Sequence, residues 1–190
     1  MMPHTRGGGW SEMHRKPALE TELKLRIPAT GPLRPLLEAL GFREAIPAQS
    51  EVSVLWDRDG ELRIAGSALR TRAYAGHARL TWKGPKVPDA LLKIRPEIET
   101  GVTDLASLEA LLGALGYAPV LRMEKVRAVW RREELEACLD ETPFGCYLEL
   151  EGDPQAIRVA MEGLGLAPDR AETRSYPELY LAHGLGTIAP

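Results

Sequence analysis

The sequence predicts an α+β fold in which a long antiparallel sheet, curled or closed into a barrel, carries short helices on its outer face. Most of the chain alternates apolar and polar residues with a period of two, as half-buried strands do. Only three short stretches have helical periodicity, and they are too short to form a helical bundle alone. These helices therefore need a sheet to pack against, and a sheet with this many strands tends to curl.

Length and composition are those of one folded domain. The chain has 190 residues, of which 44% are hydrophobic and 27% charged, enough to bury a core without disulfides. Residues 1–17 contain three consecutive glycines and no periodicity, so we expect a flexible leader there. Residues 18–183 are expected to form a single domain, and residues 184–190 a loose C-terminal tail.

Charge and cysteine usage exclude several classes of protein. No apolar run approaches the ~18 residues of a membrane span, and the N-terminus lacks the apolar core of a signal peptide. The two cysteines form no CxxC pair, which disfavours a disulfide scaffold or a structural zinc site. A formal net charge of −3 disfavours a nucleic-acid partner. We therefore expect a cytoplasmic protein with no membrane partner.

Seven stretches are predicted to be strands. In chain order they are Leu19–Ile27, Glu51–Asp57, Ala68–Ala75, Ala78–Lys83, Leu91–Val102, Arg122–Arg131 and Tyr147–Gly152. Asp57–Gly60 and Ala75–His77 have the residues of hairpin turns and are expected to join neighbouring strands.

Three apolar stripes predict helices. They consist of Leu33, Leu36, Leu37 and Leu40; of Leu105, Leu108, Leu111, Leu112 and Leu115; and of Ile157, Ala160, Met161 and Leu164. Thr103 or Asp104 is a candidate N-cap for the second helix, and Asp153-Pro154 suits the start of the third. A glutamate-rich strand precedes each helix and a glycine follows it, which gives the chain a weak threefold repeat.

Charged residues gather on one face of six predicted strands, because alternate residues of a strand share a face. They are Glu20, Glu22, Lys24 and Arg26; Arg70 and Arg72; Lys83; Lys93, Arg95, Glu97 and Glu99; Lys125 and Arg127; and Glu149 and Glu151. In any one strand, a solvated outer face would explain the pattern. Together, the opposite apolar faces must pack against helices, and a closed barrel would then turn the charged faces inward.

A channel lined by both signs of charge needs ligands of both signs, because desolvated charges are costly without partners. Paired glutamates suit a divalent cation with oxygen ligands, Mg²⁺ or Mn²⁺. Clustered arginines and lysines suit a polyanion, and phosphate best matches the planar fork of arginine. The sequence therefore predicts a metal–polyphosphate site.

An ordered series of motifs resembles the CYTH family, the triphosphate tunnel metalloenzymes, over residues 18–181. Glu20-Thr21-Glu22-Leu23-Lys24 matches the ExExK motif of that family. The matches that follow are Ala68–Arg72, Leu80–Pro85, Arg95–Glu99, Glu124–Arg127, Leu139–Gly145, Glu149–Glu151 and Ser175-Tyr176. ExExK alone is a weak signal, but the ordered set is specific. The resemblance implies an eight-stranded antiparallel barrel whose tunnel binds a triphosphate group.

The resemblance also implies roles for individual residues. Glu20, Glu22, Glu149 and Glu151 would hold Mg²⁺ or Mn²⁺. Lys24, Arg70, Arg72, Lys83, Arg95, Lys125 and Arg127 would bind phosphate oxygens. Lys24, Glu97, Glu99 and Asp140 are the expected catalytic residues. Two roles stay open: Lys24 either balances Glu20 and Glu22 or contacts the scissile phosphate, and Asp140 either steers basic side chains of the tunnel or begins the turn at Pro143.

Family membership does not select the reaction, since related members include inorganic, thiamine and RNA triphosphatases and class IV adenylate cyclases. Such cyclases can lose the second glutamate of the pairs that match Glu97–Glu99 and Glu149–Glu151, whereas this chain keeps both pairs. No set of residues indicates a purine pocket. We therefore favour metal-dependent hydrolysis of inorganic triphosphate or a small organic triphosphate.

Two alternatives remain. The first is a class IV adenylate cyclase that converts ATP to cyclic AMP and pyrophosphate, for which His14 lies where such enzymes can carry a histidine. The second is a non-catalytic polyphosphate- or nucleotide-binding module, which would have little need of three glutamate pairs. The expected partner in all cases is a small molecule such as inorganic triphosphate, thiamine triphosphate or ATP. A homodimer is compatible with external helices, but the sequence selects no patch for it.

Overall fold

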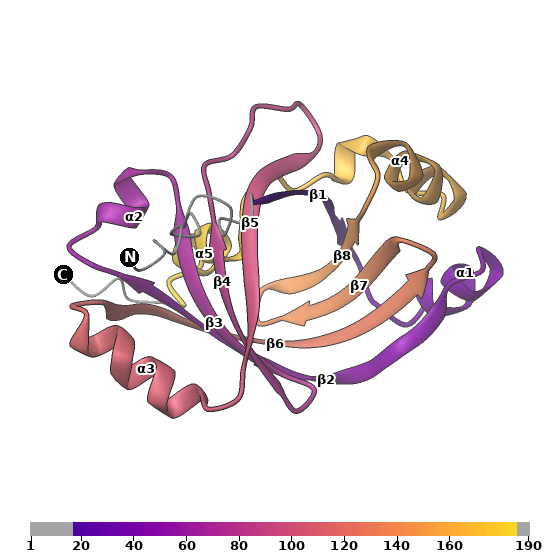
Figure 1. Cartoon of the computed structure of the whole chain (residues 1–190). Coiled ribbons are helices and arrows are strands. Elements are labelled where there is room, and N and C mark those ends of the chain that lie inside the picture. The colour runs from indigo at the N-terminus through magenta and orange to yellow at the C-terminus, as the bar shows by residue number, and fades with distance from the viewer. Residues whose placement is uncertain (1–16, 186–190) are drawn as a thin grey trace, which may run out of the picture.

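The structure is a computed structural model that describes residues 17–185, and its strands form a closed antiparallel barrel (Figure 1). The predicted leader falls outside the described residues except for Pro17, and so does the predicted tail beyond Leu185. The limits proposed for the single domain stay a prediction.

Eight strands close the barrel in the order β1-β5-β4-β3-β2-β6-β7-β8, with β8 returning to β1. They are β1 (Ala18–Ile27), β2 (Arg43–Asp57), β3 (Ala68–Tyr74), β4 (His77–Lys83), β5 (Lys93–Val102), β6 (Ala118–Arg132), β7 (Leu135–Thr142) and β8 (Gly145–Glu151). β1 divides its pairing between two neighbours: residues 18–22 pair with β5, and residues 22–27 pair with β8. The eight-stranded antiparallel barrel of the α+β prediction is confirmed.

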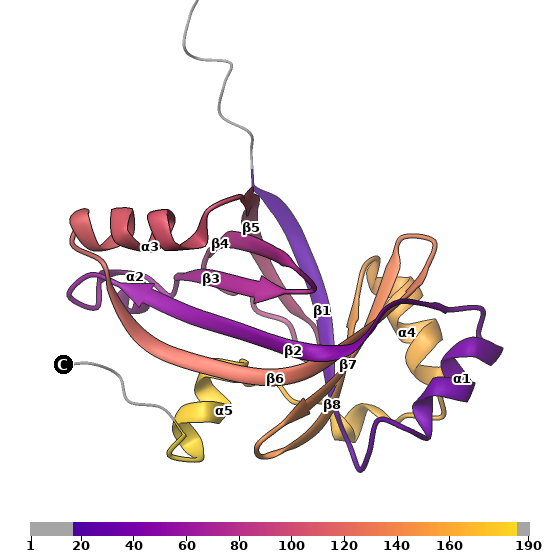
Figure 2. The ribbon, with the colours of Figure 1, turned by 90° about the horizontal axis from the view of Figure 1, so that it is seen from below.

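Helices cover the outside of this barrel. They are α1 (Leu33–Ala39), α2 (Glu61–Ile64), α3 (Leu105–Ala114), α4 (Pro154–Gly163), the 3-10 turn η2 (Pro168–Arg170) and α5 (Tyr176–Ala182). α1 and α4 lie at one end and α2 and α3 at the other, as two perpendicular views agree (Figure 1, Figure 2). The three predicted helices are confirmed as α1, α3 and α4, and each ends at a glycine with positive φ (Gly41, Gly116 and Gly165).

Capping explains where two of these helices begin. The Asp104 carboxylate accepts the backbone N–H of Ser107 at 3.0 Å, so Asp104, not Thr103, is the N-cap of α3. The Asp153 carboxylate accepts the N–H groups of Gln155 and Ala156 at 2.9 and 3.1 Å, and a proline occupies the first turn of α4.

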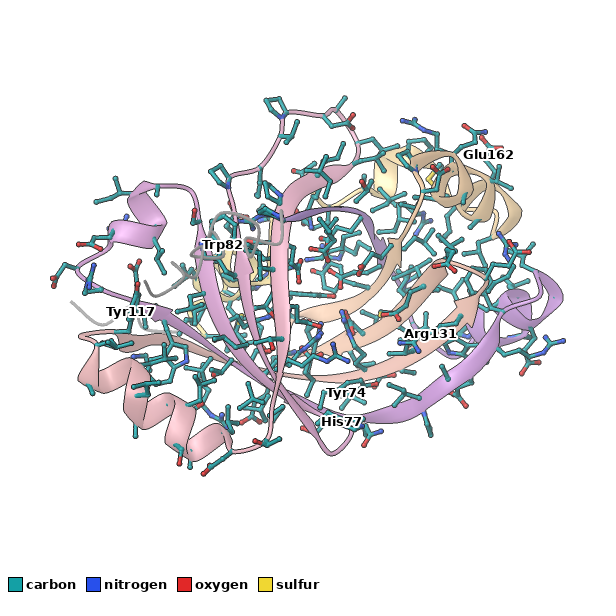
Figure 3. All side chains as sticks on the ribbon, viewed as in Figure 1. Tyr74, His77, Trp82, Tyr117, Arg131 and Glu162 are labelled. Atoms are coloured by element: carbon teal, nitrogen blue, oxygen red, sulfur yellow. The ribbon has the colours of Figure 1, made fainter. Side chains whose placement is uncertain are left out.

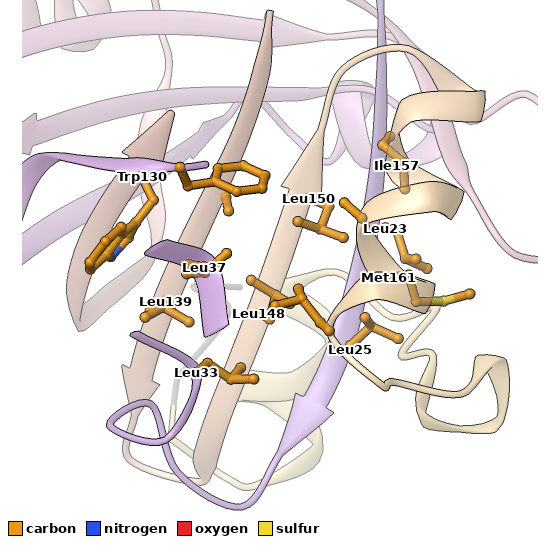
Figure 4. Close-up of a cluster of buried hydrophobic side chains, with 14 of the residues drawn as sticks. Leu23, Leu25, Leu33, Leu37, Trp130, Leu139, Leu148, Leu150, Ile157 and Met161 are labelled. Carbon is orange, nitrogen blue, oxygen red and sulfur yellow. The ribbon is translucent and has the colours of Figure 1, made fainter. Parts of the chain in front are cut away.

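The main hydrophobic core lies outside the barrel, between its wall and two helices. Leu23 and Leu25 of β1 and Leu148 and Leu150 of β8 are fully buried there, against α1 and α4 (Figure 4). Strand alternation requires the residues between them to point the other way, so the apolar contacts on the outside leave the polar residues of these strands inside the barrel.

The structure differs from the predicted elements in several respects, and β2 and β6 begin earlier than predicted, at Arg43 and Ala118. β7 was not predicted: its inner face carries Glu136, Cys138 and Asp140, which do not repeat the run of charged residues that marks the other strands. Asp57–Gly60 does not close a hairpin: the Asp57 carboxylate accepts the N–H groups of Arg58, Leu62 and Arg63 at 2.7–3.1 Å and so caps α2. α2 and α5 were not predicted either; α2, with four residues, is too short to show helical periodicity.

The second predicted turn is confirmed. β3 and β4 pair up to Tyr74 and His77, with Ala75 and Gly76 between them at φ 54° and 75°. Two positive φ values are what a two-residue hairpin needs to match the strand twist.

No helix within residues 17–185 is both long and apolar enough to cross a membrane.

The outer core yields a stability prediction. Leu148→Ala removes a side chain that is 0% exposed, so we expect it to lower the free energy of unfolding by about 2–5 kcal/mol. Ile64→Ala is the control, because Ile64 is 79% exposed and its truncation is expected to change stability by no more than about 0.5 kcal/mol. Urea unfolding followed by circular dichroism measures both, and equal effects would contradict the placement of the core.

Candidate functional site

The inside of the barrel is a cavity of about 1150 Å³ whose wall includes residues from all eight strands and from α5. Side chains tipped with nitrogen and oxygen fill the space between β5 and β6 (Figure 3). The wall includes every predicted metal-binding and phosphate-binding residue, together with Glu97 and Glu99. The remaining predicted site residue, Asp140, is 0% exposed and lies on the inner face of β7, covered by the side chains of Lys125, Arg127 and Tyr176.

Lys83 joins two glutamates at one end of the tunnel. Its Nζ lies 2.6 Å from Glu20 Oε2 and 2.8 Å from Glu97 Oε2. These residues come from β4, β1 and β5, and the pairing of Lys83 with Glu97 across adjacent strands brings the two side chains together. Burial, together with the nearby Glu97 carboxyl, raises the pKa of Glu20. Two carboxyl groups thus share a single ammonium group in a desolvated site.

Glu151 lies in a cluster of carboxyl groups. It pairs across strands with Glu22 on one side and Glu136 on the other. Glu22 is balanced by Lys93 at 2.9 Å, but Glu151 makes no ion pair with any residue of the described range 17–185. Glu151 is exposed at the end of β8, and partial desolvation, followed by the charge of Glu20, raises its pKa to about 8. This end of the tunnel therefore has more carboxylate than cation to balance it.

These carboxylates have the donor chemistry for Mg²⁺ or Mn²⁺, which prefer oxygen ligands. Their present positions are those of ion pairs: Glu20 contacts Lys83, and Glu22 contacts Lys93. Within residues 17–185, no three acidic, histidine or cysteine side chains converge on one point as metal ligands do. The residue types and the excess of negative charge fit a divalent cation, and binding it would require the glutamates to exchange a lysine for the metal.

Lys24 is almost completely buried, with 2% of its surface exposed. Its Nζ lies 3.3 Å from Glu149 Oε1, donates to the Arg174 carbonyl at 3.4 Å, and lies 3.4 Å from the centre of the Tyr176 ring. Burial lowers the pKa of Lys24 to about 8, against the opposing effect of Glu149. Lys24 thus balances Glu149, whereas Glu20 and Glu22 are balanced by other lysines.

Asp140 organises basic side chains of the wall. It accepts two hydrogen bonds from Arg127, at 2.7 and 2.6 Å, one from Lys125 at 3.0 Å and one from the Tyr176 hydroxyl at 2.5 Å. Arg127 reaches past it to Glu149. The turn after β7 is closed instead by Thr142, whose hydroxyl donates to the Gly145 carbonyl. Of the two roles left open for Asp140, the geometry is that of a group that holds basic side chains.

The three remaining arginines of the site differ in how they are held. Arg72 pairs with Glu99 at 3.1 Å, and Glu99 also accepts from Arg79 and Thr81 at 2.5 and 2.8 Å. Arg95 donates to the carbonyls of Gly84 and Gly66, so its guanidinium connects the loop after β4 with the loop before β3. The Nε of Arg70 is buried and has no hydrogen-bond partner in the described part of the chain.

The wall also contains residues to which the sequence assigned no role in binding or catalysis, among them Glu51, Lys93, Glu136 and Tyr176. Lys93 belongs to the charged face of β5 and could have been assigned from that alternation. Glu51 and Ser53 are two residues apart on β2 and share the face that lines the tunnel. The alternation that assigned the other charged faces could therefore have included Glu51. Glu136 lies on β7, and Tyr176 on α5, which are two elements that the sequence did not predict.

Comparison with known proteins is consistent with this geometry. The family model described as the CYTH domain matches residues 18–160. A protein of Methanocaldococcus jannaschii named "Putative adenylate cyclase MJ0240" is 28% identical over 172 residues, which are 85% of this chain and 98% of that protein.

Solved structures share the fold. A Vibrio parahaemolyticus protein, described in the same way as an adenylate cyclase candidate, has a TM-score of 0.73 and 22% identity and covers 86% of this chain and 98% of its own. HpAC1 from Hippeastrum, an adenylyl cyclase candidate described as having a dominant triphosphatase activity, has a TM-score of 0.63 and 21% identity and covers 90% and 98%. At these identities the likeness establishes the fold alone. The tunnel, its charged lining and the family match over three quarters of the chain lead to one identification: the protein belongs to the CYTH family.

Proposed function

We propose that this protein hydrolyses inorganic triphosphate or a small organic triphosphate inside its tunnel, in a reaction that depends on Mg²⁺ or Mn²⁺. The observation that carries the proposal is the tunnel lining. Buried cations line the wall beside a group of glutamates, one of which, Glu151 at the exposed end of β8, has a pKa raised to about 8 by partial desolvation and by neighbouring carboxylates. A metal–polyphosphate complex supplies a partner for each kind of charge in this lining: the metal for the glutamates and the phosphates for the lysines and arginines.

Binding of the phosphate chain would fall to the cations of several strands. Arg70, with its unpartnered buried Nε, and Arg72 face the tunnel from β3, Lys83 and Arg95 from β4 and β5, and Lys24, Lys125 and Arg127 from β1 and β6. Asp140 would keep Lys125 and Arg127 in place before the substrate arrives, which lowers the reorganisation that binding requires.

The glutamates would hold the metal. Glu20, Glu22, Glu149 and Glu151 are the proposed ligands, and a bound divalent cation would neutralise charge that develops on phosphate oxygens. Glu97, close to Glu20 and Lys83, is the glutamate that we propose to orient the attacking water. We propose a supporting role for Glu99, which holds Arg72 and Arg79.

We assign Lys24 to the scissile phosphate. Its pKa of about 8 keeps a large fraction of the group protonated near neutral pH, and its ammonium lies on the inner face of β1 between the proposed metal ligands and Tyr176. A protonated Lys24 would stabilise negative charge on the phosphate oxygens as the terminal phosphate leaves.

The second candidate is cyclisation of ATP to cyclic AMP and pyrophosphate. The name of the Methanocaldococcus jannaschii relative favours it, and so does the room in the cavity for a nucleoside beside the phosphate chain. HpAC1 shows that a protein named for the cyclase can be described as mainly a triphosphatase, so the name of a relative does not select the reaction. A non-catalytic polyphosphate-binding module remains the third outcome of the experiment below.

We place this activity in the cytoplasm and without membrane or nucleic-acid partners. The two cysteines, Cys138 and Cys146, are free thiols, which supports a reducing compartment. Association of two copies into a homodimer stays a prediction.

A phosphate-release assay tests the proposal. Purified protein is incubated with inorganic triphosphate, thiamine triphosphate or ATP, with Mg²⁺ or Mn²⁺ and with a chelator, and the ATP reactions are also analysed for cyclic AMP. We expect orthophosphate from triphosphate substrates, and its loss with the chelator. Cyclic AMP and pyrophosphate from ATP, with inorganic triphosphate untouched, would replace this proposal by the cyclase. Binding without turnover of any substrate would favour the binding module.

Replacing a proposed metal ligand should remove activity without unfolding the protein. In Glu22→Gln and Glu149→Gln the shape is kept and one negative charge is lost, so we expect metal-dependent turnover to fall by about 100-fold or more. Glu44→Gln is the matched control, since Glu44 pairs with Arg34 on the outer surface. Circular dichroism monitors folding. Full turnover in both tunnel variants would refute the assignment of the metal ligands.

The pKa of Glu151 predicts how stability changes with pH. Because the folded-state pKa of about 8 lies above the ordinary 4.5, the folded protein holds a proton between these values that the unfolded chain has lost. The free energy of unfolding should therefore fall as pH rises from about 5 to 8. Glu151→Gln is neutral at every pH, so its stability should decline less over this range and should exceed that of the wild type at pH 8.

Urea unfolding in the presence of a chelator, at four pH values between 5 and 8, measures this difference. Mg²⁺ added at pH 8 should stabilise the wild type more than Glu151→Gln, because only the wild type can release the proton and present a carboxylate to the metal. Parallel pH profiles for the two proteins would show that the Glu151 carboxyl is not the group responsible.

A further inference from the structure

Glu51 is a buried carboxylate among the basic residues of the tunnel, and nothing in the reaction proposed above uses it. It lies on the inner face of β2, where it pairs across strands with Tyr74 of β3 and Lys125 of β6. Only 2% of the residue is exposed. Its carboxylate therefore lies between two opposing groups of cations, one on β3 and one on β6.

The contacts of Glu51 with these cations are ionic but loose. Its oxygens lie 3.8 Å from Arg72 Nη1, 3.6 Å from Lys125 Nζ and 3.8 Å from Arg127 Nε. The Ser53 hydroxyl donates a long hydrogen bond of 3.3 Å to Oε1, and Oε2 accepts none from residues 17–185. Asp140, by contrast, binds Lys125 and Arg127 at 2.6–3.0 Å. Asp140 fixes the directions of these side chains, so Glu51 is not needed for that purpose.

Glu51 is ionised under all working conditions. Burial by itself would raise the pKa of this carboxyl, but Lys125, Arg127, Arg70 and Arg72 together lower it to about 2. One negative charge is thus placed among four cations that are also the proposed contacts of the phosphate chain. A phosphate group that binds these cations must come close to the Glu51 carboxylate, and like charges at short range in a desolvated site repel strongly.

We propose that Glu51 is an internal counter-ion that stabilises the unliganded tunnel and sets its specificity by weakening the binding of highly charged polyphosphates. This inference rests on the proposed function, because it requires that the tunnel bind a polyphosphate. Glu51 competes with the ligand for the same four cations. The repulsion grows with the charge of the ligand, so Glu51 disfavours inorganic triphosphate more strongly than a less charged phosphate compound.

Glu51→Gln provides the test, since it keeps the shape of the side chain and removes its charge. We expect the melting temperature of the unliganded variant to fall, because four cations lose their counter-ion. We expect inorganic triphosphate to bind about tenfold or more tighter than to the wild type, and orthophosphate to gain less. Calorimetric titration in the presence of a chelator measures binding alone, without turnover or metal. Glu44→Gln, which makes the same change of charge on the outer surface, should bind like the wild type.

A second background protects the test against misfolding of Glu51→Gln. Arg72→Gln removes one of the four cations. The double variant Arg72→Gln/Glu51→Gln therefore retains the net charge of the wild type, and its remaining cations repel one another less than those of Glu51→Gln. It should bind inorganic triphosphate more tightly than Arg72→Gln alone.

Each outcome separates the two proposals. Tighter binding by the Glu51 variants, with Glu44→Gln unchanged, would support the counter-ion. Unchanged or weaker binding by Glu51→Gln, and by the double variant relative to Arg72→Gln, would overturn the counter-ion and leave the proposed function intact. If neither the wild type nor any variant binds inorganic triphosphate, the polyphosphate site fails, and this inference fails with it.

Discussion

The closure of the barrel depends on the pairing of the charges that it buries. Strand alternation points every second residue of β1, β5 and β8 inward, and closing the sheet takes these side chains out of bulk water. An unpaired charge in that position would be costly, but lysines and glutamates of adjacent strands face one another: Lys24 opposes Glu149, and Lys83 opposes Glu97. Register and charge pattern therefore depend on each other, because a shift of one residue would turn the charges outward and the leucines inward.

The same pairing limits how well the site is balanced without a ligand. Glu151 has no cation of its own among the described residues, while Arg70 has a buried nitrogen without a partner. These two residues show the imbalance from both sides: the tunnel has a surplus of carboxylate near β8 and a free basic donor on β3. In the function proposed above, a metal–polyphosphate complex would relieve both.

Rigid support for the site comes from outside the barrel and from α5. The leucines of β1 and β8 pack against α1 and α4, so the inward charges are carried on strands whose opposite faces are fixed. On the side of β6 that β7 does not cover, the Tyr180 hydroxyl bonds the backbone of Glu124, and Tyr176 reaches Asp140. The C-terminal helix thus completes the wall around Lys24 and Lys125.

The sequence by itself determined the alternation, and with it the fold class and the inward direction of the charged faces; its apolar stripes determined α1, α3 and α4. Its period of two is a local property that survives in any register, so the alternation alone could assign Glu20, Lys24, Arg70 and Glu149 to one tunnel. The family motifs implied an eighth strand but not its position, because the inward residues of β7 mix charged side chains with Cys138.

Tertiary structure decided which charges meet. That Lys24 balances Glu149, that Glu51 lies among four cations, and that Glu151 is left without one follow from strand register and closure, which bring together residues far apart in the sequence. The contacts of Tyr176 with Lys24 and Asp140 were equally beyond the sequence, since α5 follows the last strand and only the folded chain brings it against β1 and β7. Periodicity can be read from consecutive residues of the sequence, whereas the balance of charge in a closed barrel depends on which residues are neighbours in the folded structure.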